Sequence, residues 1–439
     1  MDSINPLAVE LNEAIQKSNE RILDMLSEFG KRIYFPKGIL SQGAEAKAQA
    51  NKTNATIGIA TEHGEPMNLP SIRRSIDHIS PKDSFGYAPP AGKLELREAW
   101  LKKILDDNPS LRSKALSTPI VTNGLTHGLS LSADLFVNPG DTIILPDKLW
   151  GNYRLMLSVR YGGQIKTYPF YGDGGGFNTT AFRSSLMENA QAGGKLLVLL
   201  NFPNNPTGYT INVREAEEIA RAIQDAASSG CNIIALCDDA YFGLFYDDET
   251  LKESLSGYLA GLHPRIMTVK IDGATKEDYV WGFRVGFLTF CLDNSAGKDE
   301  IFNALERKTM GAIRSSISNC SHISQTLVLE GLKSPTLAEE RKEKADTMTA
   351  RALKVKEVLE NDKYADAWDV YRFNSGYFMC LKLKSVDSEE LRKHLLSKYG
   401  IGVIALGGSD LRIAFSCVEE KDIQELFDTI YEGVKDLSK

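Results

Sequence analysis

The sequence of 439 residues contains few cysteines and no long apolar run. Its six cysteines are scattered over the second half of the chain, at Cys231, Cys237, Cys291, Cys320, Cys380 and Cys417. This number and spacing fit neither a disulfide framework nor a zinc site. No stretch approaches the roughly 18 consecutive apolar residues of a membrane span. We therefore expect no disulfide-stabilised domain and no membrane partner.

Basic segments are also missing. The first residues, Met1 to Asn5, lack the basic region and apolar region of a secretory signal. The net charge is −7, and no long basic run is present, which argues against a sequence-independent nucleic-acid binder. The six histidines show no metal-ligand spacing. We expect a cytoplasmic enzyme that acts on small molecules, with no nucleic-acid partner and no metal.

The composition, with 42% hydrophobic and 25% charged residues, is that of a chain that can bury a sizeable core. Between about residues 120 and 290, strand-like runs alternate with helical patterns. The runs cover residues 119–122, 142–146, 164–170, 195–200, 233–237, 266–271 and 285–291. The helical patterns cover residues 124–137, 151–161, 179–190 and 212–229. This alternation predicts an α/β fold with a mainly parallel, seven-stranded sheet flanked by helices.

The two ends of the chain have a different pattern. Residues 1–40 contain a helical stretch that ends near Gly30 and predict an arm, followed by a loop over 41–55 and a short strand over 56–60. A charged helix over 337–361 leads into a smaller α/β segment. We expect an arm over 1–40, a large domain over 70–320, and a small domain built from 41–69 and 321–439.

Several strand-like runs end in residues with chemically useful side chains. One run enters a rigid Asn-Pro turn that contains Asn205, and the next ends in Asp238 followed by Tyr241. A third run precedes Lys276, with Arg284 eight residues later. Because the carboxyl ends of parallel strands meet at one edge of a sheet, we expect these side chains to gather there.

In this order, the motifs resemble those of the class I/II aminotransferases, which are fold-type-I enzymes that use pyridoxal 5′-phosphate (PLP). The resemblance covers about residues 55–439 and implies PLP as cofactor. Lys276 matches the lysine that forms the Schiff base and later moves the substrate proton. A partly buried lysine with cationic neighbours suits this role, because the amine must be available unprotonated.

The resemblance also implies roles around the cofactor ring. Asp238 matches the carboxylate that keeps the pyridine nitrogen protonated, which makes the ring an electron sink. Asn205 and Tyr241 match the groups that hydrogen-bond the phenolic oxygen. Trp150, in the sequence Trp150-Gly-Asn-Tyr153, matches the ring that stacks on the pyridine, although a core aromatic is an alternative interpretation.

The phosphate needs hydrogen-bond donors and positive charge. Gly124, Leu125 and Thr126 lie between a strand and a helix and match the phosphate loop of the family. Arg284 supplies a planar guanidinium suited to phosphate. One departure is Gly273, which stands where family members often carry a hydroxyl. Tyr87 resembles the tyrosine that reaches the phosphate of the neighbouring subunit, and a loop aromatic is the alternative.

Substrate binding is expected to depend on arginines. Arg412 matches the residue that grips the α-carboxylate with two parallel hydrogen bonds. Arg314 resembles the arginine that aspartate and aromatic aminotransferases donate from the partner subunit to a side-chain carboxylate, although the prolines that usually follow are replaced by Cys320-Ser321. A solvated surface arginine is the alternative. Gly58 resembles a residue of the strand that closes over substrate.

The sequence therefore predicts a PLP-dependent aminotransferase. We expect it to move the amino group of L-aspartate or an aromatic amino acid to 2-oxoglutarate. Asn205 and Trp150 belong to both the cofactor and the substrate site, and a homodimer would share Tyr87 and Arg314 between subunits. A PLP lyase or decarboxylase on the same fold is an alternative, and a non-catalytic PLP-binding protein is another. Residues 1–50 are too short and insufficiently basic for the DNA-binding segment of a regulator.

Overall fold

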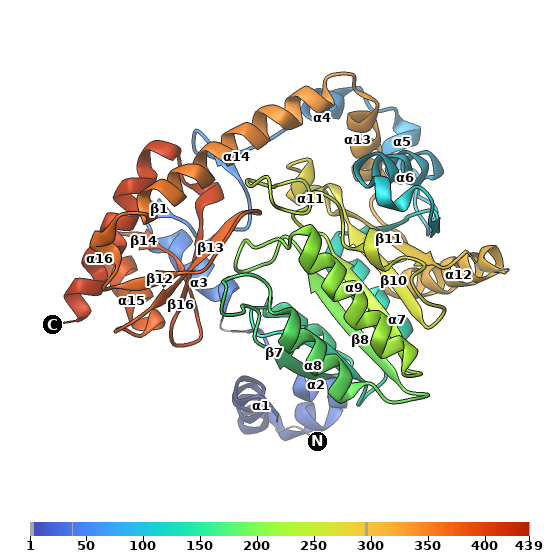
Figure 1. Cartoon of the computed structure of the whole chain (residues 1–439), viewed down its shortest axis with the longest axis horizontal. Helices are drawn as coiled ribbons and strands as arrows, with labels where there is room; N and C mark the ends of the chain where they lie inside the picture. Colours follow the sequence, from blue (N-terminus) through green and yellow to red (C-terminus); the bar gives the residue numbers. More distant parts are fainter. Residues whose placement is uncertain (1–3, 37, 295–296, 439) are drawn as a thin grey trace.

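The computed structural model describes residues 4–36, 38–294 and 297–438. Its centre is an eight-stranded sheet with the order β4-β11-β10-β9-β8-β6-β7, in which β5 also pairs with β11 (Figure 1). The strands are β4 (Ala115–Leu116), β5 (Ile120–Asn123), β6 (Thr142–Pro146), β7 (Gln164–Tyr168), β8 (Lys195–Asn201), β9 (Asn232–Asp238), β10 (Ile266–Asp272) and β11 (Val285–Leu292).

The sheet is mainly parallel, as the sequence predicts. Strands β7, β6, β8, β9 and β10 pair in parallel, whereas β11 is antiparallel to β10, β5 and β4. The predicted number of seven strands is wrong, because the short strand β4 adds an eighth. Two residues are too few to give a periodic signal. The α/β fold class is confirmed.

Helices cover the central sheet on both faces. Helices α8 (Thr179–Asn189) and α9 (Val213–Ser228) lie side by side on one face, and α7 (Leu125–Phe136) lies on the other (Figure 1). Asn212 caps α9, and Glu215 completes the capping box by accepting from the backbone N–H of Asn212. The helical pattern predicted at 151–161 is a π-helix over Arg154–Arg160.

A second, antiparallel sheet has the order β12-β13-β16-β15. Its strands are β12 (Trp368–Val370), β13 (Phe378–Leu383), β15 (Ile404–Leu406) and β16 (Asp410–Ala414). It packs with α15 (Ser388–His394) and α16 (Ile423–Leu437), and the long helix α14 (Leu337–Leu359) leads to it from the large sheet (Figure 1). The domain boundaries expected from the sequence stay a prediction.

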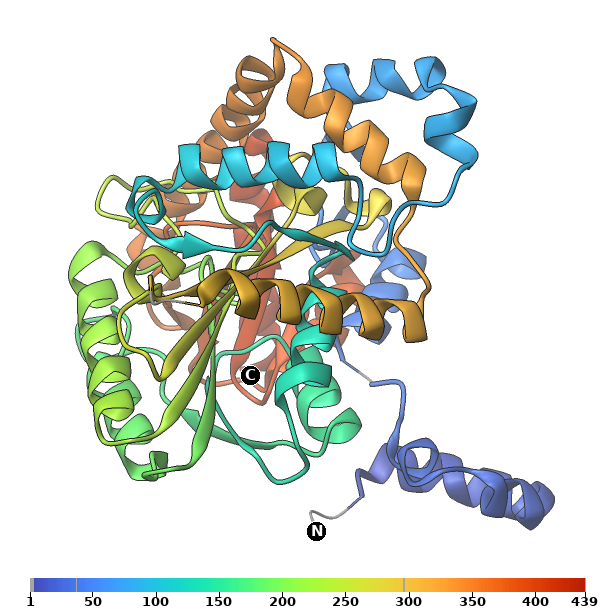
Figure 2. The same cartoon turned by 90° about the vertical axis from the view of Figure 1, so that its right-hand side faces the viewer.

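The amino-terminal arm consists of α1 (Pro6–Met25) and α2 (Glu28–Arg32). Figure 2 shows α1 standing clear of the body. The arm meets the body through α2, where Arg32 donates to the carbonyl oxygen of Ser158 at 3.3 Å and Phe29 lies against Arg160.

Two expectations for the following segment are wrong. The predicted loop over 41–55 is largely the helix α3 (Ile39–Gln49), whose small residue Ala46 packs closely against Gly402. The predicted strand over 56–60 is an irregular segment with a bend at Gly58 and Ile59, which lies between β1 (Thr53–Asn54) and β2 (Thr61–Glu62). Side chains from the far end of the chain bind its carbonyl groups instead: Arg412 donates to Thr56, and Ser416 to Ile59.

The remaining elements are two short strand pairs and several further helices. Strand β1 pairs with β14 (Ile401–Gly402), and β2 pairs with β3 (Glu65–Pro66). The other α-helices are α4 (Pro70–Ser75), α5 (Pro81–Phe85), α6 (Leu94–Asp107), α10 (Ser256–Leu259), α11 (Ala274–Glu277), α12 (Lys298–Ser316) and α13 (His322–Lys333). Within the described ranges, no helix combines the length and apolar character needed to cross a membrane.

Candidate active site

The carboxyl ends of three adjacent parallel strands bring the predicted residues together. Strand β8 ends at Asn201, β9 ends at Asp238, and β10 runs into the short helix α11 that carries Lys276. Asn201 and Asp238 are directly paired across β8 and β9. The amine nitrogen of Lys276 lies 5.0 Å from the centre of the Tyr241 ring. The strand ends therefore gather as expected.

Asn201 fixes the loop that carries Asn205. Its side-chain oxygen accepts from the backbone N–H of Asn205 at 2.9 Å, and its side-chain nitrogen donates to the backbone carbonyl of Asp238 at 2.9 Å. One buried amide thus ties the turn after β8 to the end of β9.

Asp238 is a buried carboxylate with specific donors. The Tyr153 hydroxyl donates to one oxygen at 2.6 Å, and the backbone N–H of Ala240 donates to the other at 3.1 Å. Burial raises the pKa of Asp238 to about 6, although the Tyr153 hydrogen bond and the charge of Lys276 oppose this shift. A cationic group placed against this carboxylate would favour its ionised form.

Tyr153 is a site residue that the sequence reasoning missed. It is buried, and its ring meets the ring of half-buried Trp150 edge to face at 5.4 Å. A signal was present, because Tyr153 closes the Trp-Gly-Asn-Tyr motif three residues after Trp150, which is one helical turn. The π-helix that begins at Arg154 follows it directly, and such helices are frequent at functional sites.

The amine of Lys276 is prepared for nucleophilic chemistry. Burial lowers its pKa from 10.5 to about 8; the charge of Arg284 adds to this effect, and the charge of Asp238 opposes it. A substantial fraction of the amine is therefore neutral close to physiological pH, as attack on a carbonyl carbon requires.

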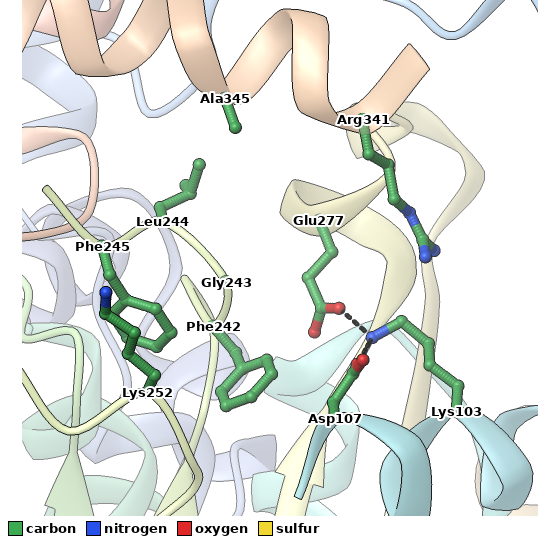
Figure 3. A pocket seen from close by; sticks show the side chains of 10 residues that line it. All are labelled: Lys103, Asp107, Phe242, Gly243, Leu244, Phe245, Lys252, Glu277, Arg341 and Ala345. Atoms are coloured by element: carbon green, nitrogen blue, oxygen red, sulfur yellow. Dashed lines mark hydrogen bonds and ion pairs between the residues drawn. The ribbon is translucent and has the colours of Figure 1, made fainter. Parts of the chain in front are cut away.

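An ion pair anchors the helix that carries this lysine. Figure 3 shows Glu277, the neighbour of Lys276, directed toward Lys103 of helix α6. Lys103 also binds Asp107 at 2.6 Å. These residues line a pocket of about 270 Å³, which the loop after Tyr241 and helix α14 also line. The pair ties α11, the helix of Lys276, to α6.

The segment from β5 to α7 forms a cradle for an anion. Gly124 has a φ of 73°, and a Cβ atom there would lie 2.3 Å from the guanidinium of Arg284. Only glycine therefore allows Arg284 to lie against this backbone. Helix α7 begins at Leu125 and Thr126. The N–H groups at its amino-terminal end and the Arg284 guanidinium can therefore bind the same anion. Arg284 is itself held in the left-handed region, with φ at 55°, and donates to the carbonyl of Trp281 at 3.3 Å.

The structure gives a physical reason for the departure at Gly273. A Cβ atom at this position would lie 2.7 Å from the Cα atom of Gly286 and 2.7 Å from the carbonyl oxygen of Val285. Strand β11 passes too close for any side chain, so a hydroxyl residue does not fit at position 273.

Arg412 is a buried cation with neutral partners. It donates to the side-chain oxygen of Asn205 at 3.2 Å and to the carbonyl oxygen of Thr56 at 2.9 Å. Its guanidinium also lies 4.2 Å from the centre of the Phe378 ring. Among the described residues, its Nε atom has no hydrogen-bond partner. A buried guanidinium without a carboxylate partner is suited to bind one from a ligand.

Gly58 lies close to the same cluster. A Cβ atom there would be 3.7 Å from Phe378 and 3.9 Å from the hydroxyl oxygen of Tyr241. These are ordinary contact distances, so this approach does not in itself require glycine.

Two predicted residues stay outside the cluster of this single chain. Tyr87, which follows helix α5, is 93% exposed. Arg314 is exposed near the end of helix α12, where it donates to the hydroxyl of Ser318. Neither takes part in the hydrogen bonds and ring contacts around Lys276.

The residues that do converge fit PLP. A lysine with a lowered pKa, a buried carboxylate and an anion cradle lie within one set of strand ends, and the cradle has no room for a Cβ atom at Gly124. Tyr241 lies beside the lysine, and Asn205 accepts from Arg412. Burial raises the pKa of the Tyr241 phenol, which keeps it a hydrogen-bond donor. In the described part of the chain, no group of His, Cys, Asp or Glu is arranged to hold a metal ion.

Comparison with known proteins agrees with this geometry. Residues 52–430 match the family described as aminotransferase class I and II. A probable N-acetyl-LL-diaminopimelate aminotransferase from Bacillus subtilis is 26% identical over 366 residues, covering 79% of each chain. An aspartate aminotransferase from Bacillus sp. strain YM-2 is 26% identical over 303 residues, covering 68% of this chain and 70% of the relative.

Solved structures show the same fold. An aminotransferase from Anaerococcus prevotii superposes with a TM-score of 0.80 at 21% identity, covering 93% of this chain and 98% of the other. The cytoplasmic aspartate aminotransferase of Saccharomyces cerevisiae gives a TM-score of 0.79 at 20% identity, covering 95% of this chain and 100% of the other. The chain therefore belongs to the class I and II aminotransferases and is a PLP-dependent aminotransferase.

Proposed function

We propose that this aminotransferase takes the amino group of L-aspartate or an aromatic amino acid and passes it to 2-oxoglutarate. The observation that carries the proposal is the position of Arg412, which is buried, free of any described carboxylate partner and bonded to Asn205 beside the Lys276 cluster. A substrate carboxylate bound to Arg412 would direct the rest of a small amino acid toward the amine of Lys276. Curated relatives named aspartate aminotransferase support the choice of donor.

The chemistry divides among the gathered residues. When bound, PLP supplies an electron sink for the electrons of the substrate Cα–H bond. Lys276 would hold the cofactor covalently and then carry the proton that leaves and returns at Cα. Asp238, oriented by Tyr153, would keep the pyridine nitrogen of the cofactor protonated. Tyr241 and Asn205 would donate to the phenolic oxygen of the cofactor.

Binding of the phosphate and of the substrate uses separate cations. Arg284 and the backbone of Gly124, Leu125 and Thr126 would bind the phosphate. Arg412 would bind the α-carboxylate of donor and acceptor alike. Trp150 would stack on the cofactor ring, and Gly58 would lie over the substrate.

The proposal includes a homodimer with shared sites. Tyr87 and Phe85 are almost fully exposed beside the short helix α5, an unusual position for large aromatic side chains in a single chain. In the dimer, Tyr87 would reach the phosphate of the partner subunit. Arg314 would bind the side-chain carboxylate of a dicarboxylic substrate and turn aside for an aromatic ring.

The absorbance of the purified holoenzyme tests the proposed donor. We expect L-aspartate to convert the cofactor band to that of the amine form, and added 2-oxoglutarate to restore it without release of ammonia or carbon dioxide. A band that responds to another amino acid but not to L-aspartate or L-tyrosine would contradict the donor assignment. Release of carbon dioxide or ammonia in place of transfer would favour the lyase or decarboxylase alternative.

The lowered pKa of Lys276 predicts a pH profile. The rate at which the cofactor-free enzyme reacts with pyridoxal, which lacks the phosphate, should rise with a midpoint near pH 8, because the neutral amine predominates above its pKa. Arg284→Gln removes a cation that lowers this pKa, so the midpoint should move upward, toward the ordinary lysine value of 10.5. The exposed Arg112→Gln serves as control and should leave the midpoint unchanged. A midpoint near 10.5 in the unaltered enzyme would contradict this assignment.

Mixed dimers test whether Arg314 acts across subunits. Arg314→Leu should raise the KM for aspartate about a hundredfold and change the KM for tyrosine little, because only aspartate loses a charged partner. Arg307→Leu, an exposed arginine on the same helix α12, is the matched control. Co-expression of Arg314→Leu with Lys276→Ala subunits should restore one native site per mixed dimer, since each site would take Lys276 and Arg314 from different chains. No restored aspartate activity in isolated mixed dimers would refute the shared site.

A further inference from the structure

An ion pair joins the large sheet to the second sheet beside the active site. Lys148 follows strand β6 of the large sheet, and Asp410 opens strand β16 of the second sheet. The amine nitrogen of Lys148 lies 2.5 Å from a carboxylate oxygen of Asp410. The two side chains are 21% and 9% exposed, so this pair is far less solvated than an ordinary surface ion pair.

One aromatic ring packs against the pair and is itself stacked on a second ring. The Tyr371 hydroxyl donates to Asp410 at 3.1 Å, and the Lys148 amine lies 5.0 Å from the centre of the Tyr371 ring. Tyr371 is itself stacked on Tyr171 of the large-sheet side, with 5.1 Å between ring centres. Burial alone would lower the pKa of Lys148, but the hydrogen bond to Asp410 and its charge outweigh burial and raise the pKa. Lys148 therefore stays charged in this setting.

Both ends of the pair lead directly to the active site. Lys148 stands two residues before Trp150, and its carbonyl oxygen accepts from the side chain of Asn204 at 3.2 Å, next to Asn205. Asp410 stands two residues before Arg412 on the same strand, so both side chains lie on the same face of the second sheet.

The two segments make room for solvent next to the pair. A cleft of about 250 Å³ lies between residues 147–149 on one side and residues 406–410 on the other. The ion pair therefore bridges the two walls of this cleft, and its removal would take away a polar contact that fixes the distance between them.

We propose that Lys148 and Asp410 are a positioning pair that sets the guanidinium of Arg412 against Asn205. The proposal depends on the proposed role of Arg412 in binding the substrate carboxylate. Since the amino donor and the 2-oxo acid acceptor would bind the same arginine, loss of the pair should weaken the binding of both substrates in parallel. Binding of PLP, which depends on the strand ends of the large sheet, should not change.

Substitutions in the holoenzyme test this pair. Lys148→Met and Asp410→Asn should each raise the KM for amino donor and 2-oxo acid about tenfold, with kcat and cofactor content nearly unchanged. The affinity for the unreactive carboxylates succinate and 3-phenylpropionate, measured by calorimetry, should fall by a similar factor. The double variant should be no worse than either single one, because both remove the same interaction.

Lys195→Met is a matched control. Lys195 binds Asp141 at 2.6 Å with 29% and 19% exposure, at the opposite, amino-terminal edge of the large sheet. This change should affect thermal stability as much as Lys148→Met does and leave both KM values and carboxylate affinity unchanged.

The possible failures are distinguishable. Unchanged KM values and carboxylate affinity in both single variants, additive losses in the double variant, or equal losses in Lys195→Met would each overturn the positioning role. If Lys148→Met does not fold, Asp410→Asn, which keeps the shape of the side chain, decides alone. Arg412→Leu should abolish carboxylate binding; if it does not, the proposed role of Arg412 itself is wrong, whatever the pair does.

Discussion

The burial of the Asp238 carboxylate at the end of a central strand is the constraint on which the active site depends. An ionised group at such a depth is costly unless hydrogen bonds and a nearby cation compensate. Tyr153 and the N–H of Ala240 supply the hydrogen bonds, and Lys276 supplies a charge. The same burial lowers the pKa of Lys276, so one desolvated region shifts the pKa of both Asp238 and Lys276.

Arg412 extends this arrangement toward the second sheet. Its two neutral partners, Asn205 and Thr56, come from the turn after β8 and from the irregular segment after β1. The substrate carboxylate would thus be bound where three separate parts of the chain meet. The Lys148–Asp410 pair bridges the two sheets near this junction, which is the basis of its proposed effect on the position of Arg412.

The sequence predicted the parts that depend on local pattern. Strands β8 and β9 are apolar runs bounded by polar residues, and β10 is a mostly apolar run interrupted by Thr268 and Lys270. The rule for parallel strand ends then placed Asp238 and Lys276 at one edge. Roles for individual residues came from the family resemblance, and they remain predictions.

The sequence did not predict features that depend on distant contacts. Strand β4 has two residues, and helix α3 contains small and polar residues that resemble a loop. Lys148 and Asp410 lie 262 residues apart, so no spacing rule connects them. The absence of a side chain at Gly273 follows from the approach of Gly286, which only the packed strands make visible.

Reduction of the holoenzyme with borohydride, followed by peptide mapping, tests the central claim most directly. The reagent makes the bond between the cofactor and its lysine permanent, so mass spectrometry identifies the residue. We predict a single pyridoxyl group on the peptide that contains Lys276, and none in Lys276→Ala. A pyridoxyl group on another lysine, or none on a reconstituted enzyme, would contradict the account.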